Sequence, residues 1–407
     1  MARQTGKTMG QATDFNRLRT KRKRGLFLRR LIILALIAGL IFAARSMGTM
    51  LVEHQLPTLA QNFFGRLGGP GFPVRMPAGN LEQVRALGSD IAVINGANLH
   101  LYGRNGRELL SAQRVGQGAV LLTAGNRMLT YTVGGQAFTI HFQNRQILEG
   151  EHDSPIRAAA LGRTGNYAIV SSTMQFRSQL IVFNEQFGER FRRNTSELVA
   201  MVALCPSGNE VAAGSFATQG GELYSTVTAF VFDREEPLVR MEFHGEFILG
   251  LEYLNYGRIA VITDHGLRVI DTGAGRIVGS HDIVGGAVAS SRVGDGQILL
   301  LGENPENRVQ TAILFGESGQ ELGRATPQQA VRDMQVGSIG VFILTTGGIT
   351  VYDHAMNEQG KHEQVGIQRI LLAGGTLYYF VYGEIRVLGP IEIDVTEAAV
   401  YETVEGD

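Results

Sequence analysis

The stretch Val269-Ile270-Asp271-Thr272-Gly273-Ala274-Gly275-Arg276-Ile277 decides the fold, because it joins an apolar strand end to a new strand through a polar turn. An Asp side chain can hold its own backbone in a turn, and Gly supplies the positive φ that a hairpin needs. Variants of this turn begin at positions 103, 143, 184, 233, 271, 316, 353 and 389, between 36 and 49 residues apart. Eight copies at this period, in sequence made of strands, predict a β-propeller of four-stranded blades.

The sequence around these turns contains short apolar runs separated by Gly, Asn and Asp, with no helical period after Val74. We therefore expect residues 74–407 to form an all-β propeller of eight four-stranded blades. Seven blades, a β-sandwich or two smaller β domains are the alternatives. The last repeat lacks a fourth strand before Pro390, so either Ile391–Val395 or the segment Val74–Ala78 would close the ring.

Charge is distributed unevenly along the chain. Residues 1–44 carry ten Lys or Arg against one acid, Asp14, whereas residues 45–407 carry 27 basic and 37 acidic residues. The acidic body excludes a typical nucleic-acid partner, because phosphate binding depends on Lys and Arg.

The basic segment leads into the one strongly apolar run, Leu31–Ala44, which has no polar side chain. Positive charge before a span keeps that side in the cytoplasm. The sequence predicts a basic cytoplasmic tail (1–25), one transmembrane helix as an anchor (26–52), a stalk or linker (53–73) and an extracytoplasmic propeller (74–407), in a single-pass protein of the cell membrane. A cleaved signal peptide is the alternative, although Arg45 interrupts the small-residue pattern that cleavage requires.

Motifs for chemistry are absent from the sequence: it contains no GxSxG, HExxH, Walker or strand-linked GxGxxG pattern. Cys205 is the only cysteine, which excludes an internal disulfide and a CxxC motif. The nine histidines are scattered without ligand spacing, although a ring of them around the axis stays open. We therefore expect no catalytic, metal or cofactor site, and a non-catalytic interaction or scaffold module. An enzyme that uses the axial channel is the alternative function.

The repeats differ most in their middle hairpins. These hairpins are longer in the third, fourth and sixth repeats, at Ser171–Ser178, Ser215–Ser225 and Gly302–Arg308. Loops on a rigid scaffold are the usual place for recognition. The sequence therefore predicts a binding face for a protein or envelope partner at Phe176, Arg177, Phe216, Tyr224 and Asn304. The alternative is variation in loop length, with Phe216 and Tyr224 packed on their neighbours.

Strand ends such as Val269–Gly273 and Val351–Asp353 resemble WD40-like and quinoprotein-like propeller repeats over most of residues 84–390. The whole layout resembles an uncharacterised family of membrane-anchored proteins from Gram-positive, clostridia-like bacteria, known only as a domain of unknown function. The quinoprotein-like resemblance implies, as the alternative function, a cofactor-dependent oxidoreductase or a hydrolase. Against it, the chain has no Trp and one Cys, whereas those repeats and that cofactor pocket normally use Trp and paired Cys.

Overall fold

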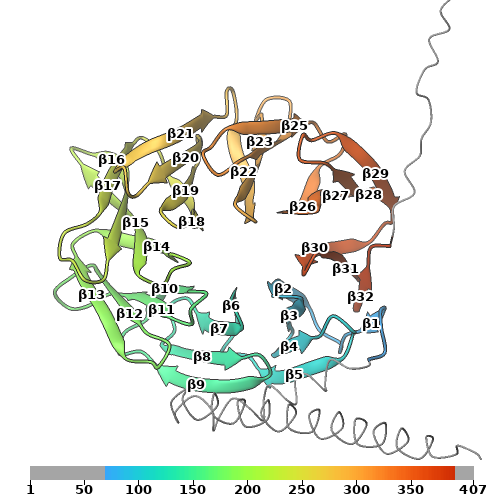
Figure 1. The fold of residues 1–407 in the computed structure, drawn as a ribbon, viewed down its shortest axis with the longest axis horizontal. Coiled ribbons are helices and arrows are strands. Elements are labelled where there is room, and N and C mark those ends of the chain that lie inside the picture. Colours follow the sequence, from blue (N-terminus) through green and yellow to red (C-terminus); the bar gives the residue numbers. More distant parts are fainter. Residues whose placement is uncertain (1–68, 390–407) are drawn as a thin grey trace, which may run out of the picture. The chain divides into compact units, whose positions relative to one another are not determined.

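The computed structural model describes residues 69–389 of the chain. Every regular element in this range is a β-strand, and the strands form eight four-stranded antiparallel sheets arranged in a ring (Figure 1). The predicted all-β propeller with eight blades is confirmed, and the alternatives of seven blades or a sandwich are wrong. The expected cytoplasmic tail and anchor, and most of the stalk, lie outside the described residues.

The strands are named β1 to β32 in chain order. Blade 1 contains β2 (Leu81–Leu87), β3 (Asp90–Asn95), β4 (Asn98–Tyr102) and β5 (Glu108–Gln113). Blade 2 contains β6 (Ala119–Ala124), β7 (Arg127–Thr132), β8 (Ala137–Phe142) and β9 (Arg145–Glu151). Blade 3 contains β10 (Ile156–Leu161), β11 (Tyr167–Ser171), β12 (Ser178–Phe183) and β13 (Glu189–Thr195). Blade 4 contains β14 (Leu198–Leu204), β15 (Glu210–Gln219), β16 (Glu222–Val231) and β17 (Val239–His244).

The second half of the ring repeats this order. Blade 5 contains β18 (Ile248–Asn255), β19 (Arg258–Thr263), β20 (Gly266–Asp271) and β21 (Arg276–Asp282). Blade 6 contains β22 (Ala287–Gly294), β23 (Gln297–Glu303), β24 (Gln310–Phe315) and β25 (Glu321–Ala325). Blade 7 contains β26 (Val331–Gly337), β27 (Gly340–Thr345), β28 (Gly348–Tyr352) and β29 (Glu358–Glu363). Blade 8 contains β30 (Ile367–Ala373), β31 (Thr376–Val381), β32 (Glu384–Val387) and β1 (Val74–Arg75).

In blades 1 to 7 the repeated turn joins the third strand to the fourth. In blade 5, Asp271 Oδ1 accepts a hydrogen bond of 2.8 Å from the backbone N–H of Ala274, and Gly275 has φ +63°. In blade 7, Asp353 Oδ1 accepts from the N–H of Ala355 at 2.9 Å. In these two blades the Asp side chain thus holds the turn, as the sequence indicated.

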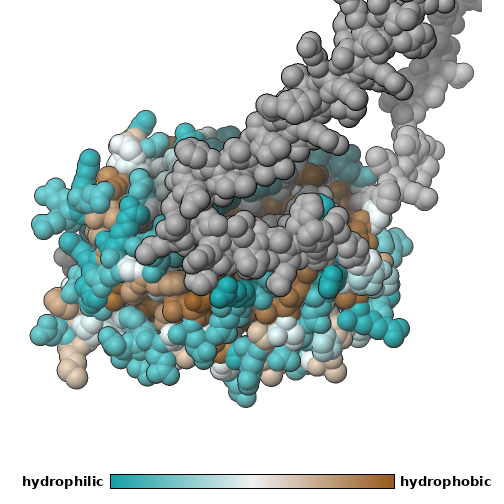
Figure 2. All heavy atoms as spheres, turned by 60° about the horizontal axis from the view of Figure 1, so that its bottom comes forward, coloured by the Kyte–Doolittle hydropathy of each residue, from teal (hydrophilic) through white to brown (hydrophobic). Residues whose placement is uncertain are grey.

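The core lies between neighbouring blades rather than at the axis. Each blade buries both of its faces, so the second and third strands are mostly buried, as in β28, where all five residues are buried. Between blades 2 and 3, Tyr167 packs on Phe138 and Phe183, with ring centroids 5.9 and 4.7 Å apart. The outermost strands instead mix half-buried and exposed residues, and Figure 2 shows hydrophilic residues spread over the outer surface, with hydrophobic residues visible between them.

The ring is closed by the N-terminal segment of the propeller. Val74 pairs with Ile385, and Arg75 with Glu384, so that β1 becomes the outermost strand of blade 8. Val74 is buried in the cluster between blades 8 and 1, and the ring of Phe72 lies 5.1 Å from that of Tyr378. Of the two segments that the sequence offered, the one near Val74 therefore closes the ring; Ile391–Val395 lies outside the described residues.

The two flat sides of the ring carry different connections. The proximal face contains the links between first and second strands and between third and fourth strands. The described chain also begins and ends here, since the N–H of Gly71 bonds to Asn105 O (3.0 Å) and the N–H of Leu388 to Leu377 O (2.9 Å). The distal face contains the links between second and third strands and between successive blades. Among residues 69–389 no helix is long and apolar enough to cross a membrane.

Candidate functional site

The five residues predicted to form a binding face all belong to links on the distal face, or to strand ends beside them. Phe176 and Arg177 lie between β11 and β12, Phe216 and Tyr224 lie on either side of the β15–β16 turn, and Asn304 follows β23. Their environments differ, and these differences decide which of them can contact a partner.

The loop of blade 3 presents Phe176 and Arg177 to solvent. The N–H of Phe176 bonds to Thr173 Oγ1 at 3.0 Å, and the N–H of Thr173 bonds to Phe176 O at 3.1 Å, so the loop is held by its own groups. The carbonyl of Arg177 accepts a hydrogen bond of 3.1 Å from Arg157 Nη1. Both predicted residues therefore project from an ordered loop.

The hairpin of blade 4 is long because its strands are long. β15 and β16 each have ten residues and are joined by the tight Gly220–Gly221 turn. Phe216 packs partly on the core cluster between blades 4 and 5, and Tyr224 lies beside His244 with ring centroids 5.8 Å apart. The alternative interpretation, in which Phe216 and Tyr224 pack on their neighbours, thus describes part of the environment of these two residues.

Sequence reasoning missed Phe247, which lies in the link between blades 4 and 5. Its ring stacks on that of Phe216 at a centroid distance of 4.3 Å and an interplanar angle of 17°, yet 41% of Phe247 is exposed. Its N–H donates to Asp264 Oδ1 at 2.8 Å. Burial raises the pKa of Asp264, but the hydrogen bonds from Phe247 and His265 outweigh this and lower it. The run Phe247-Ile248-Leu249 is uniformly apolar, so sequence alone does not reveal which ring faces solvent.

Asn304 has a structural role in its loop. Its Oδ1 accepts a hydrogen bond of 2.9 Å from the N–H of Glu306, and its own N–H donates to Val309 O at 3.0 Å. These bonds fix the turn and leave Val309 exposed beside it.

Exposed apolar side chains are concentrated on the distal face. Of the fifteen large apolar residues that are exposed among residues 69–389, eleven belong to distal links or to the strand ends next to them: Val133, Met174, Phe176, Leu198, Leu223, Phe247, Leu249, Val284, Val309, Val365 and Tyr382. Tyr256 and Ile339 lie in proximal links, and Ile277 and Leu322 lie near the start of outermost strands. Single exposed apolar residues are ordinary, but their concentration on one side is typical of an interaction surface.

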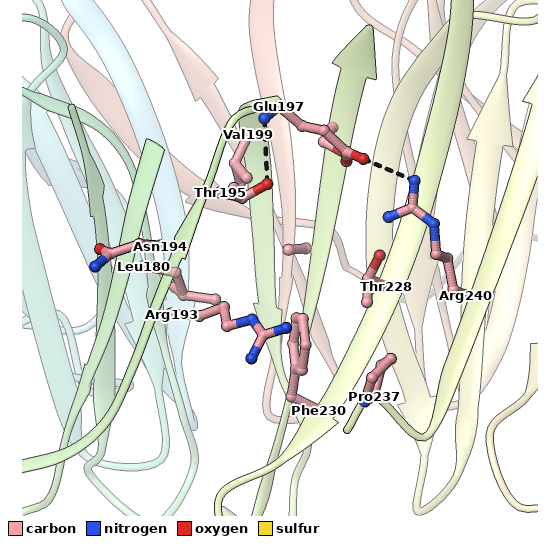
Figure 3. Close-up of a pocket in the computed structure, with 12 residues that line it drawn as sticks. Leu180, Arg193, Asn194, Thr195, Glu197, Val199, Thr228, Phe230, Pro237 and Arg240 are labelled. Atoms are coloured by element: carbon pink, nitrogen blue, oxygen red, sulfur yellow. Dashed lines mark hydrogen bonds and ion pairs between the residues drawn. The ribbon is translucent and has the colours of Figure 1, made fainter. Parts of the chain in front are cut away.

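Two hollows adjoin blade 4. One, of about 470 Å³, is lined by Leu223, His244 and Phe247 together with Glu222, Gly245 and Asp264. The other, of about 210 Å³, lies between blades 3 and 4 and contains Glu197, Arg193 and Arg240 (Figure 3).

Charge in the second hollow is largely neutralised internally. Glu197 Oε1 accepts a hydrogen bond of 2.7 Å from Arg240, and its other oxygen accepts one from Ser215. Burial alone would raise the pKa of Glu197, but these two hydrogen bonds outweigh it and lower the pKa. Arg193 lies over the ring of Phe230 at 5.5 Å, a cation–π contact that can be followed in Figure 3.

The bond between Glu197 and Ser215 belongs to a repeated arrangement. A polar side chain just before the innermost strand bonds to a hydroxyl at or beside the end of the second strand in three more blades: His152 to Ser171 (2.9 Å), Glu246 to Thr263 (2.7 Å) and Gln329 to Thr346 (2.7 Å). Because Glu and Gln fill the same place as His152, the His152–Ser171 contact is a structural bond rather than a nucleophile with its base. Burial lowers the pKa of His152. In the described part of the chain no three His, Cys, Asp or Glu side chains form a group that could hold a metal.

The ring, its repeated turn and its closing strand define an eight-bladed, WD40-like β-propeller. Residues 76–384 match the sequence profile of a family of unknown function (DUF5711), and the chain belongs to that family. No curated protein matches the sequence of the chain.

Solved structures share the fold at low identity. The computationally designed Ika8 protein is 13% identical, with a TM-score of 0.55 over 77% of this chain and 98% of Ika8. The C-terminal WD40 domain of Sif2 is 11% identical, with a TM-score of 0.56 over 79% and 99% of the two chains. The WD40 domain of SCAP from fission yeast is 12% identical, with a TM-score of 0.51 over 78% and 94%. At these identities the similarity shows the fold alone.

Proposed function

We propose that this protein is a non-catalytic interaction module, anchored in the membrane through residues 26–52, whose distal face binds a protein or envelope partner outside the cytoplasm. The observation that carries the proposal is the concentration of exposed apolar side chains on the distal face. Removing such side chains from water on binding is the main favourable term in most protein association.

Blades 3 to 5 contain the densest part of this surface. Met174, Phe176, Leu198, Leu223 and Phe247 are all exposed there, and Leu223 and Phe247 line the larger hollow. Glu222 and Asp264 line the same hollow, which gives the apolar residues a polar border. An apolar centre within a polar rim is the usual composition of a protein interface.

The position of the chain's attachment supports this use of the distal face. Residues 1–68 join the propeller at Gly69, on the proximal face, where Gly71 bonds to Asn105. The described chain therefore begins on the face opposite to the one that carries most of the exposed apolar side chains. The basic segment before Leu31 supports an N-terminus that stays in the cytoplasm.

Site-specific photocrosslinking tests the proposal in intact cells. A photoreactive residue at Phe247 should give a discrete adduct, whereas one at Tyr256, which is 74% exposed on the proximal face, should give none. Protease added outside the cells should digest the adduct and spare a tag at Met1. Adducts of equal yield from both positions would contradict a distal binding face, and an adduct that protease cannot reach would contradict the topology.

A paired set of substitutions connects the adduct to the apolar surface. Met174→Ser with Leu249→Ser should reduce the adduct from a photoreactive residue at Leu223 by at least tenfold, and Tyr256→Ser with Ile339→Ser should leave it unchanged. Since all four residues are exposed, neither pair should change stability by more than about 1 kcal/mol. If both pairs leave the adduct intact, the partner does not use these apolar side chains.

A further inference from the structure

Charged side chains occur on the innermost strands of five consecutive blades, 5 to 8 and 1. In seven of the eight innermost strands the register shifts by one residue near its start. After the shift, pairing resumes at one residue of each innermost strand. Arg85 in blade 1, Glu252 in blade 5 and Arg292 in blade 6 each lie two residues beyond this point. In blades 7 and 8, the residue at which pairing resumes is itself charged: it is Asp333 in blade 7 and Arg369 in blade 8. Five consecutive blades around the ring thus carry a charge at one of two positions, which lie two residues apart along the innermost strand.

The same positions in blades 3 and 4 carry no charge. They hold Ala158, Ala160, Met201 and Ala203. Figure 1 shows the innermost strands surrounding the axis, with β2 and β18 on opposite sides of it. Arg85, Glu252 and Arg369 are exposed, although they belong to innermost strands, so their side chains reach solvent in the axial space.

One charge pair in this group is complete. Arg292 Nη2 bonds to Asp333 Oδ1 at 3.0 Å, and Asp333 Oδ2 accepts from the N–H of Ile370 at 3.2 Å. The Asp333 side chain is only 3% exposed, so this pair is part of the wall of the channel.

Arg85 and Arg369 have no comparable partner. Arg85 Nη1 donates to its neighbour's carbonyl, Val84 O, at 3.1 Å, and no Asp or Glu in the described range forms an ion pair with either arginine. Arg85 is nevertheless close enough to interact electrostatically with two cations, Arg292 and Arg369, and with two carboxylates, Glu252 and Asp333. Although both side chains touch solvent, the protein around them desolvates their charges. This desolvation, followed by the charge of Arg292, lowers the pKa of Arg85, and desolvation also raises the pKa of Glu252. Each charged group would therefore gain from a counter-charge in the channel.

We propose that the axial channel is a binding site for a small oxyanion, a carboxylate or phosphate group, held between Arg85 and Arg369. The guanidinium group presents a planar set of N–H donors that matches both kinds of oxyanion and binds them bidentately. Glu252, on the opposite side, accepts a hydrogen bond from the other end of the ligand and disfavours ligands that are anionic at both ends. The site is separate from the distal apolar surface and stands whether or not that surface binds a partner.

Calorimetric titration of the full-length chain tests the site. Inorganic phosphate and glycine, each titrated at constant ionic strength, represent the phosphate and the carboxylate source. We expect saturable binding of at least one of them, weakened at least tenfold by Arg85→Gln and by Arg369→Gln. Arg276→Gln, on the exposed outermost strand β21, is the matched control and should leave the affinity unchanged. An unchanged melting temperature for the two channel variants shows that the ring is intact.

Three results would overturn the proposal. The first is that neither anion binds, and the second is an equal loss of binding in Arg276→Gln, which would indicate general charge screening. The third concerns residues 390–407, which contain six Asp or Glu and no Lys or Arg. If either anion binds only after these residues are deleted, the result would indicate that the channel is occupied by the chain's own acidic residues rather than by a free ligand.

Discussion

The proximal and distal faces of the ring are built from the same eight repeats but differ in what their links do. Proximal links contain the recurring Asp or Gly turn, and the described chain begins and ends on that side. Distal links differ in length from blade to blade and expose most of the large apolar side chains of the described range. The comparison indicates that the repeat preserves the turns of the proximal side, whereas length and exposed side chains vary on the distal side, where loops can serve recognition.

The largest expected effect concerns closure at the proximal side. Starting the propeller at residue 77 removes β1 together with Phe72, Val74 and Met76, which pack in the cluster between blades 8 and 1. Losing this burial and leaving β32 unpaired should lower the free energy of unfolding by roughly 3 kcal/mol or more. Chemical denaturation measures this change in the free energy of unfolding.

Deleting residues 390–407 is the matched control for closure. Because β1 already fills the outermost place of blade 8, this deletion should leave the denaturation midpoint within error of the intact chain. A large loss on removing the C-terminal residues, with little loss on removing β1, would show that the ring closes at the other end of the chain.

Replacing one glycine on each face by alanine compares the two faces, because each substitution adds a single methyl group. Gly106 on the proximal face has φ +77°, and a Cβ there would press against the carbonyl oxygen of Gly71 and lie 2.8 Å from Val74 Cγ2. Gly221 in the distal turn of blade 4 has φ +89°, with nothing within 4 Å of a Cβ. Gly106→Ala should cost about 3 kcal/mol from strain plus collision, and Gly221→Ala about 1 kcal/mol from strain alone. Equal costs would mean that the contact between Gly71 and Gly106 does not hold the chain's start in place.

Much of the fold could be predicted from the sequence because its signal is local and repeated. The turn at Asp271 depends on a side chain bonding within three residues, so each copy marks the end of a third strand wherever it occurs. The sequence could not decide which end of the propeller closes the ring, because the segments that begin at Val74 and at Ile391 are both short and apolar. The choice depends on packing between blades 8 and 1, some 300 residues apart in the chain.

The candidate site was harder to predict, since exposure is a property of the assembled ring. Loop length did locate the distal links, yet Asn304 serves its own turn and Phe216 partly serves the core. In the sequence, Phe247 belongs to an apolar run in which no residue is marked as exposed, and Arg85 is a single charged residue in a strand with no distinguishing motif. Only the assembled ring, together with the strand register within each blade, places Arg85, Arg369 and Glu252 around one axis.

The smallest expected effect is a difference in sign between two histidines. His141, toward the proximal end of β8, is buried, and burial lowers its pKa below the ordinary 6.5. Its contribution to stability is therefore full above pH 6.5 and is lost as the pH falls, since the unfolded chain then binds the proton more readily. His265, in a distal turn, is exposed, and its hydrogen bond to Asp264 (2.9 Å) raises its pKa. Its contribution is full below pH 6.5 and is lost as the pH rises through the raised value.

The two substitutions should accordingly move stability in opposite directions in acid. Relative to the unsubstituted chain, His141→Leu should become more stable on going from pH 8 to pH 5, whereas His265→Gln should match it at pH 8 and become less stable at pH 5. Urea denaturation at both pH values gives each difference, and every other titrating group cancels because it is common to both chains. Parallel shifts for the two variants would show that His141 is not held neutral by burial, and the contrast between this buried histidine and the exposed His265 would fail.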